Sequence, residues 1–136
     1  MPGGKPQRST TFEATCVGGP ERFARGRFVL AHEYEVVNES WWGEHRRVGL
    51  IVNCMRAGDV LAYPSNAATS QIVYVDARSP KERDPDFQRA LPLVEQTLEA
   101  GQDVLVHCSQ SFHRAPAIVA AFMKKLCGVS FQVVPP

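Results

Sequence analysis

Three short apolar runs limit most strongly what this chain can fold into. Gly49–Cys54 and Asp103–His107 are apolar along most of their length, and Gln71–Val75 is rich in β-branched and aromatic residues. Each run is too short for a stable helix, and its composition is typical of a strand buried on both faces of a sheet. The chain therefore has a sheet whose strands are separated by long connections.

Helical patterns follow the second and third of these runs. Within Pro85–Ala100 apolar residues recur at spacings of three and four, which predicts one buried helical face. Asp84 can cap this helix and Gly101 can end it, whereas Pro92 should bend it or mark its true start. Arg114–Leu126 predicts a second, largely buried helix. Strands alternating with helices predict an α/β fold with a mostly parallel central sheet flanked by helices.

The first part of the chain gives weaker signals. Residues 1–20 are rich in Gly, Pro, Ser and Thr, which predicts a flexible tail with a short ordered piece at 11–17. The remaining residues, 21–136, are expected to form a single domain. Arg27–Ala31 is a candidate strand, and Glu39–Arg47 a short helix or loop. Its Trp41 and Trp42 are expected to be a packing patch.

Composition excludes several classes of protein. The 136 residues are 44% hydrophobic and 21% charged with a net charge of +1, so bulk charge gives no reason to expect nucleic acid or a membrane as partner. The sequence has no apolar run long enough to span a bilayer, and its start lacks the apolar core of a secretory signal. These features predict a cytoplasmic protein with free thiols in a reducing compartment. The four cysteines and four histidines lack metal-ligand spacing, so no metal or other cofactor is expected.

Cys108 and Arg114 form the clearest candidate site. Cys108 follows a buried strand directly, and Arg114 opens the next helix. In open α/β sheets ligands bind beyond the carboxyl ends of the strands, and helix N-termini favour anions. A thiol placed there has a lowered pKa, and an arginine fork can hold two phosphate oxygens. The segment between them, Ser109, Gln110, Ser111, Phe112 and His113, is therefore expected to wrap a phosphate.

These residues resemble a known family. The segment resembles the dual-specificity branch of the protein tyrosine phosphatase superfamily, because it has Val-Leu-Val-His-Cys, then five residues, Arg and an apolar helix. Ile51-Val52-Asn53 also resembles the family's sheet strand that ends in Asn. The resemblance covers roughly 49–128 and is strongest over 103–123. It implies a protein-tyrosine-phosphatase-like fold.

The resemblance also implies roles for individual residues. Cys108 would attack phosphorus and form a phosphocysteine, while Arg114 would bind the phosphoryl oxygens. The family's general acid lies just after a strand upstream of the cysteine, which favours Asp76, with Asp84 and Asp86 as alternatives. His107 would orient the loop through hydrogen bonds. The substrate would be a phosphorylated protein, dephosphorylated at tyrosine and at serine or threonine.

Two loop residues depart from the family pattern. Ser111 stands where the family usually has Gly, and His113 where it usually has Ser or Thr; Ala115 also replaces a common hydroxyl residue. Gly allows positive φ and close approach of the backbone to phosphate, and the hydroxyl assists the second chemical step. The alternative is therefore a catalytically impaired module that binds phosphorylated partners without turnover.

Other interpretations stay open. Relatives in this superfamily act on phosphoinositides or RNA 5′-phosphates, and rhodanese-like sulfur transfer also uses a cysteine between strand and helix. Cys54 is expected to be a structural thiol, with a disulfide to Cys108 as the alternative. The family usually continues with further helices, which predicts a truncation at the C-terminus or a core completed by the N-terminal part or a partner.

Overall fold

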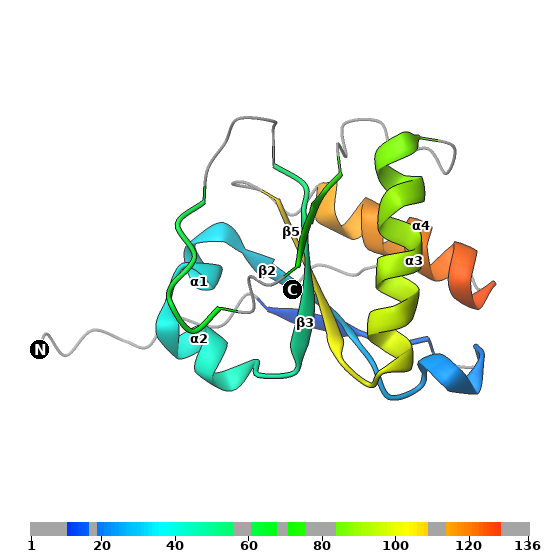
Figure 1. Cartoon of the computed structure of the whole chain (residues 1–136), viewed down its shortest axis with the longest axis horizontal. Helices are drawn as coiled ribbons and strands as arrows, with labels where there is room; N and C mark the ends of the chain where they lie inside the picture. Colours follow the sequence, from blue (N-terminus) through cyan, green and yellow to red (C-terminus); the bar gives the residue numbers. More distant parts are fainter. Residues whose placement is uncertain are drawn as a thin grey trace, which may run out of the picture.

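A computed structural model describes residues 11–16, 19–55, 61–67, 71–75, 84–108 and 114–128, with only the backbone of Arg114 included. Its centre is a five-stranded sheet with the order β1-β2-β5-β3-β4 (Figure 1). The strands are β1 (Phe12–Ala14), β2 (Phe28–His32), β3 (Val48–Asn53), β4 (Ile72–Tyr74) and β5 (Asp103–Cys108). The helices are η1 (Glu21–Phe23), α1 (Glu33–Val36), α2 (Glu39–Glu44), α3 (Pro85–Glu99) and α4 (Arg114–Cys127).

The sheet is mostly parallel, as the alternation of strands and helices predicts. Strands β2, β5, β3 and β4 run in the same direction, and only β1 pairs antiparallel, with β2. β1 lies within the short ordered piece expected at 11–17. β5 is the central strand, and every one of its residues is buried. The α/β class with a mostly parallel sheet and flanking helices is therefore confirmed.

α3 and α4 cover one face of the sheet (Figure 1). Alternate residues of β2, β5 and β3 point into this layer, because successive side chains of a strand face opposite sides. Phe122 of α4 is the link between the two helices and the sheet. Its ring stacks on Phe87 of α3 with centroids 4.7 Å apart and on Phe28 of β2 at 6.2 Å.

α1, α2 and residues 61–67 cover the opposite face. Trp41 and Trp42 are buried there beside Val29, Leu105 and other strand residues. The indole of Trp42 donates to the Val36 carbonyl at 2.7 Å, so its polar edge is satisfied inside the core. The interpretation of the two tryptophans as a packing patch is confirmed.

The ends of the long helices follow the sequence signals. Gly101, which follows the C-cap residue Ala100 of α3, and Gly128, directly after α4, adopt positive φ values of 74° and 69°, a conformation that glycine accepts without strain. The expectation that Pro92 marks the true start of the helix was wrong, because α3 begins at Pro85 and continues through Pro92. Pro92 is exposed, so the backbone hydrogen bond that it removes lies on the solvent side of the helix.

The expectation that all four thiols are free is also wrong. A disulfide joins Cys16, which follows β1, to Cys127 at the end of α4, with Cα atoms 5.9 Å apart. Sequence spacing could not reveal this pair, because the folding of the sheet brings together two residues separated by 111 positions. Cys54 and Cys108 are reduced and buried.

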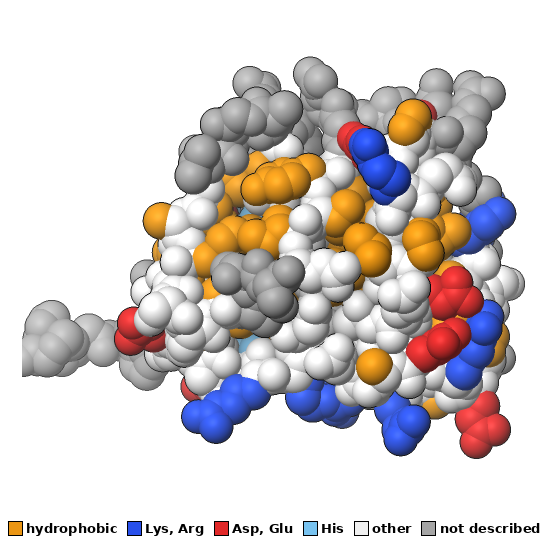
Figure 2. Space-filling model, viewed as in Figure 1, with side chains coloured by type: hydrophobic (Ala, Val, Ile, Leu, Met, Phe, Trp, Pro, Cys, Tyr) orange, Lys and Arg blue, Asp and Glu red, His pale blue; other side chains and the backbone are white. Residues whose placement is uncertain are grey.

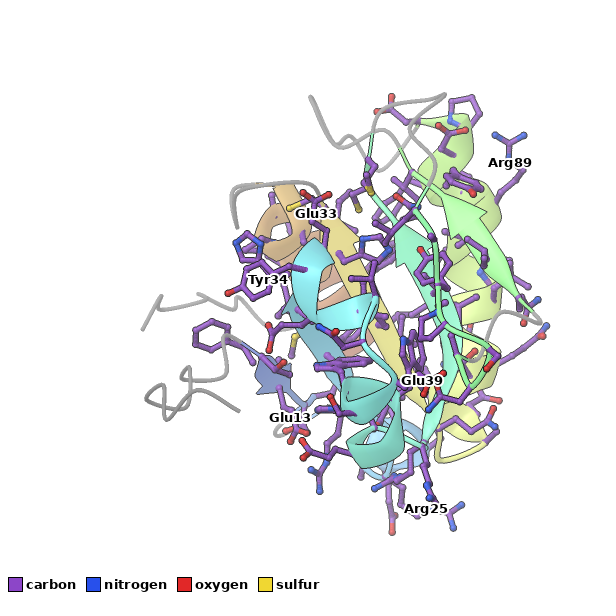
Figure 3. The ribbon with its side chains drawn as sticks, turned by 90° about the vertical axis from the view of Figure 1, so that its left-hand side faces the viewer. Glu13, Arg25, Glu33, Tyr34, Glu39 and Arg89 are labelled. Carbon is purple, nitrogen blue, oxygen red and sulfur yellow. A yellow bond between two sulfur atoms is a disulfide. The ribbon has the colours of Figure 1, made fainter. Side chains whose placement is uncertain are left out.

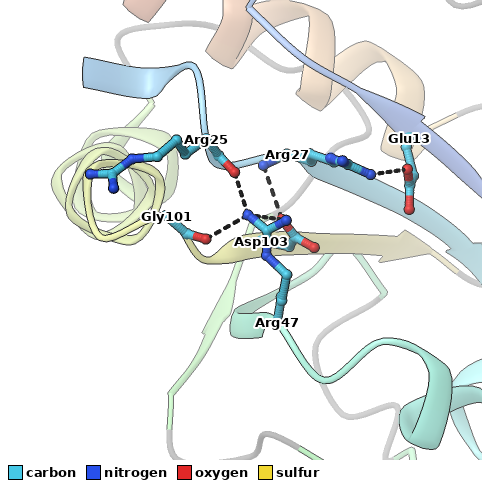
Figure 4. Close-up of polar contacts among 6 residues, drawn as sticks. All are labelled: Glu13, Arg25, Arg27, Arg47, Gly101 and Asp103. Carbon is cyan, nitrogen blue, oxygen red and sulfur yellow. Dashed lines mark hydrogen bonds and ion pairs between the residues drawn. The ribbon is translucent and has the colours of Figure 1, made fainter. Parts of the chain in front are cut away.

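Polar contacts hold the amino ends of the central strands together (Figure 4). Asp103 at the start of β5 accepts the Arg27 backbone N–H at 3.1 Å and lies 4.0 Å from the Arg47 guanidinium. Arg47 also donates to the carbonyls of Arg25 and Gly101. Burial raises the pKa of Asp103, and the neighbouring arginines oppose this effect. The cluster joins the segments that lead into β2, β3 and β5 at one end of the sheet.

The surface differs between the middle of the molecule and its lower edge. In Figure 2 hydrophobic side chains gather over the middle of the face, whereas basic side chains line the lower edge. Partly buried apolar residues of 61–67 and β4 contribute to the opposite-face core, namely Leu61, Tyr63, Ala67 and Ile72. Within the part of the chain that the structure describes, no helix is long and apolar enough to cross a membrane.

Candidate active site

The candidate site lies at the carboxyl edge of the parallel strands. Cys108 ends β5, and its Cα partner on β2 is His32. On the other side of β5, Asn53 at the end of β3 is the partner of His107. The N-terminal ends of α3 and α4 lie at the same end of the sheet (Figure 1). Figure 3 shows Glu33 and Arg89 toward this end and Arg25 at the opposite one.

Cys108 lies in the core layer between the sheet and α4. Its side chain is only 4% exposed, and it belongs to the same buried cluster as Cys54 and Val106. The Cys54 N–H donates to the His107 carbonyl at 2.8 Å, which extends the β3–β5 pairing beyond the last strand residue. The backbone on the N-terminal side of the thiol is therefore held firmly.

α4 begins at Arg114, as the sequence predicts. Apolar residues of the helix, including Ala115, Ile118 and Val119, are buried against the sheet and fix its position. Its start thus lies at the strand edge where Cys108 ends. The predicted phosphate loop, Ser109, Gln110, Ser111, Phe112 and His113, lies outside the described residues, as does the Arg114 side chain.

Of the three candidate general acids, the structure describes two, Asp84 and Asp86. Asp76, the preferred one, lies outside the described residues. Asp84 is the N-cap residue of α3, with its carbonyl accepting the Gln88 N–H at 3.0 Å. Asp86 forms an ion pair with Arg89 in the first turn of the same helix. Asp84 and Asp86 therefore lie at the correct end of the sheet, and Asp86 already has a cationic partner.

A partly buried polar network lies on the other face of the sheet, around His107, the residue that precedes Cys108. The Tyr63 hydroxyl is 2.6 Å from His107 Nε2 and 3.4 Å from Asn53 Nδ2. Asn53 Oδ1 in turn accepts the Met55 N–H at 2.8 Å. His107 and Asn53 stand in recognisable motifs of the sequence, whereas Tyr63 does not. Its only signal was an aromatic residue inside a segment of turn-like composition.

Burial sets the protonation states of this network. It lowers the pKa of the His107 imidazole from its ordinary 6.5 to about 4, so the ring is neutral at pH 7. Burial also raises the pKa of Tyr63, which keeps its hydroxyl protonated. Two neutral groups that both carry hydrogen-bonding atoms therefore lie on the face of the sheet opposite the Cys108 side chain.

An aromatic pair flanks the site on the β2 side. The ring of His32 stacks on Tyr34, with centroids 4.7 Å apart. Tyr34 is 47% exposed and projects from α1 (Figure 3). The His32 N–H donates to the Glu35 carboxylate at 3.3 Å, which holds the turn from β2 into α1. The contacts of His32 with Tyr34 and Glu35 thus hold the end of β2, which pairs with Cys108.

The arrangement presents a thiol, a helix start and a neutral imidazole at one edge. A search of the described ranges finds no group of three His, Cys, Asp or Glu residues that could hold a metal ion. Compared with models of protein families and with curated proteins, the chain matches none. The resemblance to dual-specificity phosphatases therefore depends on the residues around Cys108 themselves.

Proposed function

We propose that this protein has a protein-tyrosine-phosphatase-like fold and is a cysteine-dependent phosphatase of the dual-specificity type. The observation that carries the proposal is the placement of Cys108 at the end of the central parallel strand, followed by a buried helix that starts at Arg114. This geometry brings a thiol and the positive end of a helix to the same edge of the sheet. The substrates are phosphotyrosine and phosphoserine or phosphothreonine in proteins.

The reaction takes place in two steps. The Cys108 thiolate attacks phosphorus and forms an S–P bond while the bond from phosphorus to the leaving oxygen breaks. Asp76 donates a proton to that oxygen. A water molecule, deprotonated by the same carboxylate, then attacks the phosphocysteine, and the S–P bond breaks to release phosphate and regenerate the thiolate. Arg114 and the loop amides neutralise the phosphoryl oxygens throughout.

Phosphate release from p-nitrophenyl phosphate tests the proposal. The wild-type protein should hydrolyse it, and Cys108→Ser and Arg114→Ala should each lose at least about 100-fold in kcat/KM, because each removes a group used in the transition state. Two matched controls, Cys54→Ser and Arg89→Ala, remove a neighbouring thiol and an arginine of α3 and should retain activity. Equal rates for wild type and Cys108→Ser would rule out this mechanism.

The binding-module alternative is favoured by Ser111 and His113, which depart from the family pattern. It predicts binding of a phosphotyrosine peptide with negligible release of phosphate. Restoring the family residues with Ser111→Gly and His113→Ser should then raise turnover. A phosphocysteine that accumulates on Cys108, detected by mass spectrometry, would show that only the second step fails.

A further inference from the structure

The disulfide between Cys16 and Cys127 joins two outer parts of the fold. Cys16 follows β1, which lies at one edge of the sheet, and Cys127 is the last residue of α4. α4 has 14 residues, so the bond lies about 20 Å along the helix from Arg114 and the candidate site. The disulfide is therefore separate from the thiol of Cys108, which is reduced.

The other contacts of β1 in the described part of the chain are modest. The strand spans only Phe12–Ala14, and the last of these three residues is the one that is fully buried. Glu13 forms an exposed ion pair with Arg27 at 2.8 Å, and exposed ion pairs contribute little to stability. Just before the strand, Thr11 Oγ1 accepts the Trp41 indole N–H at 2.9 Å. The disulfide is therefore a main support of β1 at its carboxyl end.

The last turn of α4 depends on the same bond. Met123 is the last fully buried residue of the helix, and Lys124 and Lys125, which follow it, are exposed. A helix end with few buried apolar contacts opens more readily than the rest of the helix. The covalent link from Cys127 to Cys16 therefore holds this turn against the core.

The two cysteines differ in how well they are covered. A Cβ atom at Gly19 would lie 3.0 Å from Cys127 Cβ and 3.2 Å from Cys16 Cβ, and the Gly19 N–H donates to the Cys16 carbonyl at 3.1 Å. This turn packs closely on the bond, and Cys16 is only 7% exposed. Cys127 is partly buried, so a reductant can approach from its side. The basic side chains of the last turn of α4 favour the approach of a negatively charged thiolate.

We propose that the Cys16–Cys127 disulfide is a redox switch: it holds β1 and the last turn of α4 on the core, and a dithiol reductant releases both. A thiolate of the reductant attacks Cys127 Sγ, forms a mixed disulfide and displaces the Cys16 thiolate. The second thiol of the reductant then attacks the mixed disulfide, and the reductant leaves as a cyclic disulfide. The dithiol supplies two electrons and two protons, and the protein gains two thiols.

Release of β1 changes the edge of β2. The backbone of Phe28–Leu30 pairs with β1 in the oxidised protein and loses this partner when β1 leaves. An open strand edge can pair with another strand, so the reduced protein has a new site for association. β2 also ends at His32, the partner of Cys108 in the sheet. The switch goes beyond the proposed phosphatase function and does not depend on it.

Hydrogen–deuterium exchange of the whole protein with and without dithiothreitol tests the switch. After reduction, the amides of β1 and of the last turn of α4 should exchange at least about tenfold faster, because these segments open without unfolding of the core. Peptides from β5 should remain protected at labelling times at which β1 has exchanged completely. Unchanged protection of β1 would overturn the proposal. Simultaneous loss of protection in β1 and β5 would also overturn it, because the bond would then support the whole fold.

Cys16→Ser and Cys54→Ser are matched variants for this measurement. Cys16→Ser removes the bond and should show the exchange pattern of the reduced protein with and without dithiothreitol. Cys54→Ser removes a buried thiol of the same core cluster, keeps the disulfide and should respond to dithiothreitol as wild type does. Protection of β1 in Cys16→Ser equal to that in oxidised wild type would contradict the proposal. If Cys16→Ser does not fold, wild type before and after reduction still gives the decisive comparison.

The rate of reduction shows whether the bond opens in the folded protein. Alkylation with iodoacetamide followed by peptide mapping measures the free thiols that form at Cys16 and Cys127. For a switch, the rate should rise in proportion to the dithiothreitol concentration, and oxidised glutathione should restore both the bond and the protection of β1. A rate that does not depend on dithiothreitol concentration would mean that the whole protein must unfold first, and this result would refute the proposal.

Discussion

His107 should make the folded state sensitive to mild acid. Burial lowers the pKa of its imidazole from 6.5 to about 4. Between these two pH values the imidazole is therefore mostly protonated in the unfolded chain and mostly neutral in the folded protein. The unfolded state therefore gains protons first, and stability falls as the pH drops from 6.5 toward 4. With these two pKa values the loss at pH 5 is about 2 kcal/mol relative to pH 7.5, and it approaches about 3 kcal/mol near pH 4.

Urea unfolding followed by circular dichroism measures this effect. For a domain of this size a loss of about 2 kcal/mol should lower the urea midpoint by roughly 1 M between pH 7.5 and pH 5. His107→Gln cannot take up the proton, so its midpoint should fall much less over the same range. The comparison uses the pH slope of each protein, and a uniform loss of stability in the variant does not affect it.

His45→Gln is the matched control for this measurement. His45 also contacts an aromatic residue, with its ring stacked on Trp41 at 4.0 Å between centroids. The variant keeps His107 and should therefore keep the part of the acid slope that His107 contributes. If His107→Gln and wild type lose stability in parallel between pH 7.5 and pH 5, burial of the His107 imidazole is not the source of the acid sensitivity.

Three further predictions concern the disulfide, the buried aspartate and the general acid. Cys16→Ser removes the disulfide to Cys127 and should lower the free energy of unfolding by about 4 kcal/mol, because the bond closes a loop of 111 positions. Wild type in reducing agent should be as stable as the variant. Equal stability of wild type with and without reducing agent would contradict this prediction. Burial raises the pKa of Asp103, so the folded state favours the protonated carboxyl group, and stability is lost as the pH rises through the folded-state pKa. The melting temperature of Asp103→Asn should therefore rise relative to that of wild type between pH 4 and pH 7. A constant difference in melting temperature over this range would refute the prediction. Asp76→Asn should lower kcat for an alkyl phosphate by about 100-fold or more and should lower kcat less for a substrate with a good leaving group. If Asp84→Asn shows this pattern and Asp76→Asn does not, the general acid is Asp84, the N-cap residue of α3.

The sequence predicted those parts of the fold that depend on local chemistry. β3 and β5 are short continuous apolar runs, whereas α3 carries an apolar stripe at helical spacing, so both kinds of element could be located without tertiary information. Gly101 ends α3 because a left-handed residue is needed there. Pro92 was misjudged because its effect depends on which side of the helix faces solvent, and that is decided by packing.

The candidate site could be predicted only as far as the strand and helix that carry it. Cys108 and the start of α4 were identified from their spacing, and the structure places them at the same edge of the sheet. Tyr63 could not be found in this way, because its partner His107 lies 44 positions away and the contact depends on how 61–67 crosses the sheet. The disulfide between Cys16 and Cys127 was missed for the same reason.

The position of β5 has a consequence for how the chain folds. β2 and β3 precede it in the sequence, yet they do not pair with each other, because β5 lies between them. Until β5 is available, both strands have an unpaired edge, and the loops that must close to cover these edges are long. Folding should therefore be slow for a chain of this size and prone to aggregation at an early stage. The strand that ends in the candidate nucleophile is also the one on which assembly of the sheet depends.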